Sequence, residues 1–393
     1  MCRNGGGSGG LCLGEWYLPA TSQSITPTQA IMQHGVVYYD EARWISTPAN
    51  NGCNGPLWQW GDELLVGFTV GEYGTDGGFH QCRVDLPYES WLARSGDGGE
   101  SWSAWRPDGY AGETNPAVSA GSDVGVDFTA PGFVMRVEGA AYHGNRTARW
   151  FHSDNRGADW CGPRHFGGLL DDPNLTGLEF TSRTAYLVDG TGGLLLFGTA
   201  RDTSQAQTLS VMITEKTFLA RSDDGGLTFS FVSWIVSWDD NYRAAMPSPV
   251  RAADNKLVVG IRRKSSDCNW IDCFSSTDNG GTWAFLSRIT ETEVGSQFNG
   301  NPPALIRLGD GRLCCAYGNR TDRVIAVRYS QDDGGTWSAP VVVRDGFQSA
   351  AGAPDLGYPR IWQRTDGKLV AAYFWCTAER PQTHIEYTIF EAP

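Results

Sequence analysis

One octapeptide pattern, Ser-x-Asp-x-Gly-x-Thr/Ser-Trp/Phe, constrains the fold of this chain most strongly, because it recurs along the sequence. The four good copies and one degraded copy are Ser95–Trp102, Ser222–Phe229, Ser276–Trp283, Ser330–Trp337 and, degraded, Ser153–Trp160. In such a segment an Asp or Asn side chain accepts backbone N–H bonds, Gly adopts a positive φ, and the aromatic residue packs back between sheets. We call this element an Asp box. We interpret it as a structural hairpin turn whose carboxylates have no catalytic role.

Short β-rich runs that follow turn residues form a second, independent repeat. Six of them occur, at Glu63–Phe68, Gly132–Val137, Leu194–Ala200, Lys256–Ile261, Arg312–Tyr317 and Lys368–Tyr373. Several follow Gly-Asp, Asp-Asn or Asp-Gly, the dipeptides that favour tight hairpins. Six runs and five Asp boxes predict an all-β fold: a six-bladed β-propeller of four-stranded blades with Asp-box turns, in which the sixth blade has no box.

The two ends of the chain complete this prediction. Gly35–Tyr39 and Glu386–Phe390 both have the pattern of strands, and we expect one of them to close the ring by completing the last blade. We expect residues 34–393 to form the propeller and residues 1–33 to be a flexible N-terminal leader. This Gly-rich leader lacks the apolar stretch of a signal peptide.

Composition excludes several classes of partner. The chain has 31 basic and 44 acidic residues, a formal net charge of −13, and no Lys/Arg-rich run, so nucleic acid is not an expected partner. No apolar run approaches the length that spans a membrane, so no membrane partner is expected. The ten Cys show no metal-ligand spacing and the six His are scattered. We therefore predict no metal site and no cofactor.

The Asp boxes recur at intervals of tens of residues, each after a β-hairpin, and in this the chain resembles the sialidase (neuraminidase) superfamily, also called BNR-repeat proteins. The resemblance covers about residues 34–393. It implies a carbohydrate ligand. Members include sialidases, other exo-glycosidases, polysaccharide lyases with related propellers, and proteins that only bind.

Propeller topology locates the candidate site without an alignment. The starts of the innermost strands and the loops between second and third strands should share one face, opposite the Asp boxes. Polar residues at predicted inner-strand starts are Asn54, Asp127, Arg183, Arg243, Asn301 and Tyr358. Those in or beside the loops are Glu72, Asp76, His80, His143, Arg201, Arg262, Arg263, Arg320 and Trp375. We expect the catalytic and substrate-binding residues to come from these two sets.

The resemblance implies roles for some of these residues. A retaining sialidase uses a Tyr nucleophile activated by a Glu, an Asp acid/base on a loop of the first blade, and three Arg that bind the substrate carboxylate. Tyr358 stands where the nucleophile is expected, Asp76 where the acid/base is expected, and Arg262 or Arg263 where one Arg is expected. The sequence departs from the family pattern at Met246, which replaces the activating Glu, and in two inner-strand starts that carry no Arg.

These departures leave three hypotheses open. The leading one is an enzyme that cleaves a glycosidic bond of an oligo- or polysaccharide next to an acidic sugar, as a sialidase-like exo-glycosidase. The second is a lyase that acts by β-elimination beside a uronic acid, with His80, His143 and Tyr358 as acid and base and Arg201 or Arg263 as neutraliser. The third is a propeller that only binds carbohydrate. The expected substrate favours a secreted or periplasmic protein.

Overall fold

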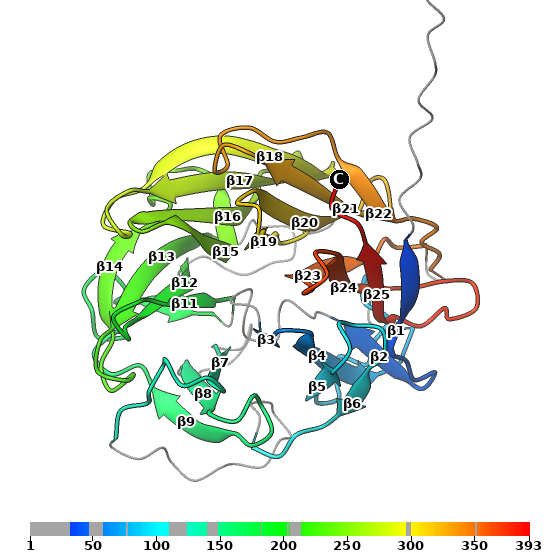
Figure 1. Cartoon of the computed structure of the whole chain (residues 1–393), viewed down its shortest axis with the longest axis horizontal. Coiled ribbons are helices and arrows are strands. Elements are labelled where there is room, and N and C mark those ends of the chain that lie inside the picture. Colours follow the sequence, from blue (N-terminus) through cyan, green and yellow to red (C-terminus); the bar gives the residue numbers. More distant parts are fainter. Residues whose placement is uncertain are drawn as a thin grey trace, which may run out of the picture. The chain divides into compact units, whose positions relative to one another are not determined.

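Strands are the only regular secondary structure in the described part of the chain. The computed structural model describes residues 32–46, 58–75, 78–109, 124–139, 148–181, 183–202, 204, 214–295, 300–349 and 352–393. These residues form six separate antiparallel sheets, which Figure 1 shows arranged around a common centre as the blades of a propeller. The predicted six-bladed, all-β fold is confirmed. No helix of membrane-spanning length occurs among the described residues.

Blades 1 to 3 vary in the number of their strands. Blade 1 contains β2 (Arg43–Ser46), β3 (Gln59–Trp60), β4 (Glu63–Glu72), β5 (Glu89–Ser95) and β6 (Ser103–Trp105). Blade 2 contains β7 (Val134–Glu138), β8 (Arg149–Ser153) and β9 (Cys161–His165). Blade 3 contains β10 (Leu178–Phe180), β11 (Ala185–Val188), β12 (Leu194–Asp202), β13 (Glu215–Ser222) and β14 (Ser230–Trp234). Blades 1 and 3 depart from the expected four strands, because the innermost strand of each is divided in two. Blade 2 has three described strands, and residues 110–123 before them lie outside the described part of the chain.

Blades 4 to 6 have the expected four strands. Blade 4 contains β15 (Arg243–Ala253), β16 (Lys256–Lys264), β17 (Cys268–Ser276) and β18 (Ala284–Val294). Blade 5 contains β19 (Ala304–Arg307), β20 (Leu313–Asn319), β21 (Val324–Ser330) and β22 (Val341–Arg344). Blade 6 contains β23 (Gly357–Gln363), β24 (Leu369–Trp375), β25 (His384–Phe390) and, as its outermost strand, β1 (Gln33–Tyr38).

The N-terminal strand completes the last blade and closes the ring, which was one of the two possibilities expected from the sequence. β1 pairs with β25 through partners such as Gly35 with Tyr387, so blade 6 joins the beginning and the end of the described chain. This pairing also explains why blade 6 has no Asp box. The third and fourth strands of that blade are the last and first strands of the propeller, and no turn connects them.

Each Asp box joins the third strand of a blade to its fourth and forms the hydrogen bonds expected from its sequence. In blade 1, Ser95 Oγ accepts a bond from Gly99 N (2.7 Å), and Asp97 Oδ1 accepts one from Ser101 N (2.9 Å). Burial alone would raise the pKa of Asp97, but hydrogen bonds from the hydroxyl and N–H of Ser101, the hydroxyl of Ser95 and the N–H of Glu100 lower it to about 2. The box carboxylate is thus bound by its own turn, which supports the structural interpretation.

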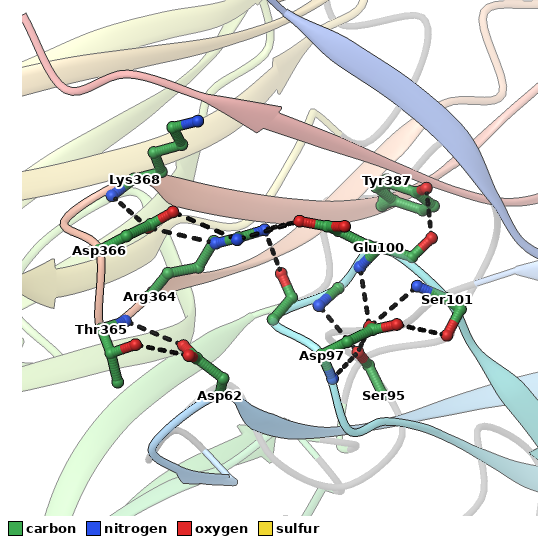
Figure 2. A network of polar contacts seen from close by, with 12 residues as sticks. Asp62, Ser95, Asp97, Glu100, Ser101, Arg364, Thr365, Asp366, Lys368 and Tyr387 are labelled. Carbon is green, nitrogen blue, oxygen red and sulfur yellow. Dashed lines mark hydrogen bonds and ion pairs between the residues drawn. The ribbon is translucent and has the colours of Figure 1, made fainter.

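Asp boxes also attach each blade to the blade before it. Figure 2 shows the box of blade 1 facing blade 6, where Arg364 Nη1 donates to Gly98 O (3.2 Å) and binds Glu100 (3.0 Å). Close packing accompanies these polar contacts: a Cβ at Gly99 would lie 2.8 Å from Val370 of blade 6. The box glycines of blades 2 to 5 are equally crowded by the preceding blade.

The hydrophobic core lies between neighbouring blades. One buried cluster combines Val250 and Ile271 of blade 4 with Leu305 and Leu313 of blade 5, and the other clusters span blades in the same way. Both faces of a second strand are therefore covered, which explains its continuous apolar sequence. The six predicted runs all fall on second strands: β4, β7, β12, β16, β20 and β24.

Candidate functional site

The candidate site lies at the end of the blades opposite the Asp boxes. Antiparallel pairing places the starts of innermost strands beside the loops that join second to third strands. Tyr358 is the second residue of β23, Arg243 is the first of β15, and Asn301 lies just before β19. The topology therefore brings residues from several blades toward the same end of the propeller.

The backbone at Tyr358 is held in an uncommon conformation. Tyr358 has a φ of 49° although it is not a glycine, and its N–H donates to Asn301 Oδ1 (2.9 Å). The preceding Gly357 (φ 117°) allows this approach, because a Cβ there would lie 1.8 Å from Asn301 Oδ1. Met246, on the innermost strand of blade 4, has a φ of 58° and also precedes a proline. Such conformations are costly and tend to cluster at functional sites.

The hydroxyl of Tyr358 lies against a buried arginine. Arg262 Nη1 donates to Tyr358 Oη (3.1 Å) and also lies 3.2 Å from the thioether sulfur of Met246. The other two donor nitrogens of this guanidinium, Nε and Nη2, have no hydrogen-bond partner among the described residues. Arg262 is 1% exposed, so these unmet donors are costly unless a ligand or water completes the site.

Three further buried arginines surround this pair. Arg183, Arg243 and Arg320 are each less than one tenth exposed. The Glu215 carboxylate, which is fully buried, binds Arg183 through one oxygen and Arg243 through the other (2.5 Å). One carboxylate thus compensates two guanidinium groups directly. Arg262 and Arg320 form no ion pair with a described residue, and they retain an excess of positive charge around Tyr358.

This excess charge changes the acidity of the site. Burial alone would raise the pKa of Tyr358, but the positive charges of Arg262, Arg320 and Arg183 lower it to about 8. Burial, followed by the repulsion of Arg243 and Arg262, lowers the pKa of Lys264 to about 8 as well. The site therefore favours negative charge, on the phenol or on a ligand.

His80 approaches this region from the loop between β4 and β5. Its Nδ1 lies 2.9 Å from Asp355 Oδ2, and the Asp355 side chain is only 3% exposed whereas that of His80 is 43% exposed. Burial lowers the pKa of His80, but the charge and hydrogen bond of Asp355 outweigh this effect, and the pKa is raised. Arg320 lies over the ring of Phe79 (5.0 Å) and over that of Tyr358 (6.0 Å), so it connects this loop to the tyrosine.

The structure thus brings together several of the residues predicted from the sequence: Tyr358, His80, Arg183, Arg262, Arg320 and Asn301. Arg201 lies at the edge of this group, because it is the cross-strand partner of Glu215, and it is paired with Glu179. Glu72, at the end of β4, forms an ion pair with Arg43 (3.4 Å) at the outside of this group.

Two predicted residues point elsewhere. Arg263 follows Arg262 on β16, and since successive side chains of a strand alternate between faces, it turns away and binds Asp240 (2.6 Å). Trp375 is fully buried in the core between blades 5 and 6, with its ring edge-on to Phe347. The sequence candidates Asn54, Asp76 and His143 lie outside the described residues.

Glu215 and Asp355 belong to the site but were not predicted. Glu215 is the first residue of the third strand of blade 3, directly after the loop between the second and third strands. Asp355 lies three residues before Tyr358, just before the innermost strand of blade 6. An ionisable residue within a few positions of a strand start is the signal that marks both of them in the sequence. Among the described residues no group of His, Cys, Asp or Glu side chains is arranged to hold a metal ion.

Comparisons with known proteins agree with this architecture. A family model described as a BNR repeat-like domain matches residues 133–370. No curated protein matches the sequence. A protein of unknown function from Dyadobacter fermentans DSM 18053 is structurally similar, with 18% identity, a TM-score of 0.63, and coverage of 92% of this chain and 99% of that one.

Two sialidases of known structure share the fold at lower identity. The Hadza microbial sialidase Hz136 is 15% identical with a TM-score of 0.53, over 89% of this chain and 65% of that one. The K499G mutant of the NanB sialidase from Streptococcus pneumoniae is 12% identical with a TM-score of 0.54, over 91% and 68%. The chain spans about two thirds of the length of these sialidases, and the likeness shows the fold alone. Nothing in these comparisons supports the lyase hypothesis.

Proposed function

Because the chain belongs to the BNR repeat-like domain family and has the fold of sialidases, we propose that it is a glycosidase. In this proposal it cleaves the bond between an acidic sugar and the rest of an oligo- or polysaccharide, and Tyr358 is the nucleophile. The observation that carries the proposal is the contact between the Tyr358 hydroxyl and Arg262 inside a group of buried arginines.

Recognition of the acidic sugar is assigned to the arginines that keep unmet donors. Arg262 and Arg320 both have guanidinium nitrogens without a partner among the described residues. A planar guanidinium pairs well with a carboxylate, and such charge-assisted bonds are the strong ones. A substrate carboxylate would also compensate the positive charge that Glu215 leaves unbalanced. Neutral sugars would bind without this gain.

The chemistry follows from the acidity of Tyr358. With a pKa of about 8, roughly a tenth of the phenol is ionised at neutral pH. The phenolate oxygen attacks the anomeric carbon, the glycosidic bond breaks, and the leaving oxygen takes up a proton. Water then attacks the same carbon, releases the tyrosine oxygen and gives up a proton. The net reaction is hydrolysis with an intermediate covalent bond to Tyr358.

Ionisation of this tyrosine does not require a carboxylate in direct contact with it. The position expected to hold an activating Glu carries Met246, whose sulfur contacts Arg262 instead. Arg262, Arg320 and Arg183 stabilise the phenolate electrostatically, and Glu215 is committed to its two arginine partners. Electrostatic stabilisation of developing charge is an established source of catalysis. We therefore assign activation of Tyr358 to the arginines.

The test compares methylumbelliferyl sialosides, uronides and neutral glycosides with the wild-type protein and two variants. We expect cleavage of an acidic glycoside and a fall in kcat/KM of at least about 10³-fold in Tyr358→Phe. Tyr329→Phe is the matched control, because Tyr329 is buried in the hydrophobic core between blades 5 and 6. Calorimetry with the uncleaved sialoside distinguishes an enzyme from a binding protein. If the sialoside binds but none of the three classes of glycoside is cleaved, the proposal is contradicted.

A further inference from the structure

The pair formed by His80 and Asp355 has the geometry of a proton-transfer group. Nδ1 of His80 lies 2.9 Å from Asp355 Oδ2, and Asp355 is nearly inaccessible while the imidazole is partly exposed. A carboxylate only accepts hydrogen bonds, so Nδ1 carries a proton and donates it. The other ring nitrogen, Nε2, is therefore the atom that can release or take up a proton. This nitrogen makes no hydrogen bond to the described residues.

Packing fixes the direction of the imidazole ring. Trp44 and Phe79 contact it edge-on, with ring centres 5.4 Å and 5.0 Å away. Asp355 holds the ring from blade 6, whereas His80 itself belongs to a loop of blade 1. A solvated surface histidine would have neither the buried acidic partner nor the two aromatic walls. This orientation is what a proton donor with a defined target requires.

The pair lies beside the proposed nucleophile. Asp355 precedes Tyr358 by three residues, and Arg320 lies over the rings of both Phe79 and Tyr358. His80 is close enough for the charges of Arg320 and Tyr358 to act on its pKa. Arg320 opposes protonation of His80 and Asp355 favours it. Asp355 thus favours the protonated imidazole next to a cationic site.

We propose that His80 is the general acid/base of the reaction and that Asp355 is its positioning residue. This inference rests on the proposed function. In the first step the Nε2 proton of the imidazolium goes to the leaving oxygen as Tyr358 attacks. In the second step the neutral imidazole takes a proton from the attacking water, which restores the imidazolium. Each catalytic cycle therefore returns both the proton and the tyrosine.

Leaving-group dependence tests the acid role. Substrates with a sugar or alkyl leaving group need protonation, whereas those with an acidic phenol leave without much help. His80→Gln should lose roughly 10²–10⁴-fold in kcat/KM on the first kind and far less on the second. In His80→Gln, azide can replace water as the nucleophile and needs no base. It should therefore restore turnover of the substrate with the phenol leaving group if breakdown of the intermediate has become limiting. His165→Gln, an exposed histidine on β9, is the matched control and should leave all rates unchanged.

Asp355→Asn tests the positioning role with a readout that structural damage alone does not produce. Loss of the carboxylate should lower the pKa of His80, so the alkaline limb of the pH profile should move to lower pH. Nitrogen NMR of the imidazole, which needs no substrate, should show the Nδ1-protonated form of neutral His80 in the wild type and its loss in the variant.

Several outcomes would overturn the inference. One is a loss in His80→Gln that is equal for all leaving groups, and another is full activity on sugar leaving groups. A third is a selective loss of activity on sugar and alkyl leaving groups in Asp76→Asn instead of His80→Gln, which would make Asp76 the acid. Turnover that requires Tyr358 but not His80 would overturn the acid role alone. Absence of wild-type turnover would overturn the proposed function and the acid role together.

Discussion

Removal of the Arg262 guanidinium should return the pKa of Tyr358 toward that of an ordinary tyrosine. Arg262 donates a hydrogen bond to this hydroxyl, at 3.1 Å, and it exerts the largest lowering effect on its pKa. The charges of Arg320 and Arg183 act on the same phenol. The variant Arg262→Gln therefore deletes the strongest of three favourable interactions and keeps a polar side chain in the same place.

The expected size of the effect follows from the strength of this bond. A pKa of about 8 instead of 10.0 corresponds to about 3 kcal/mol. A hydrogen bond to a charged group contributes about 1.5–3 kcal/mol. Loss of Arg262 should therefore raise the pKa of Tyr358 from about 8 to between about 9 and 10.

Ultraviolet absorbance of the phenolate measures this titration directly. Subtraction of a Tyr358→Phe titration from that of the wild type isolates one of the 14 tyrosines. Arg263→Gln is the matched control, because this neighbouring buried arginine binds Asp240 on the other face of β16. The reasoning would be refuted by a wild-type difference curve with no transition near pH 8, or by one that Arg262→Gln leaves in place.

Two further predictions concern stability. Gly280→Ala should destabilise the protein by about 2–4 kcal/mol in a urea titration, because φ is 94° there and the added Cβ would lie 2.1 Å from Leu219 of the preceding blade. Gly96→Ala is the control: this glycine of another Asp box faces open space, so the substitution should be nearly neutral in the same titration. Glu215→Gln should cost about 3–5 kcal/mol at neutral pH, because two buried arginines lose their partner. In the wild type, burial alone would raise the pKa of Glu215, but the charges of Arg183 and Arg243 lower it. The stability that the Glu215 carboxylate contributes is therefore complete above pH 4.5 and is lost as the pH falls. Urea titrations at decreasing pH should therefore show a smaller loss in the variant than in the wild type, and equal losses would contradict the assignment.

Repeats in the sequence predicted the architecture well because each repeat is a local structure. An Asp box contains its own hydrogen-bond partners, and an apolar run between hairpin signals is a strand buried on both faces. The division of the innermost strands in blades 1 and 3 was not predictable in this way. It depends on pairing between residues distant in the sequence, such as Ser46 with Thr69 and Gln59 with Leu64.

The same limit applies to the candidate site. Tyr358 could be predicted because topology places every inner-strand start at one end of the propeller. The sequence alone did not distinguish Arg262 from Arg263, because the choice depends on which face of β16 meets the centre. Trp375 could not be recognised as a core residue for the same reason. The contact between Asp355 and His80 was not predictable either, because it joins blade 6 to a loop of blade 1, far apart in the sequence.

A covalent trap tests the central assignment most directly. A glycosyl fluoride of an acidic sugar, with a second fluorine beside the anomeric carbon, forms the intermediate quickly and releases it slowly. Mass spectrometry of the treated protein should show one added glycosyl group, and peptide mapping should place it on Tyr358. Modification should be absent in Tyr358→Phe and retained in Tyr329→Phe. An adduct on another residue, or turnover of the acidic glycoside without any adduct, would contradict the role of Tyr358 as nucleophile.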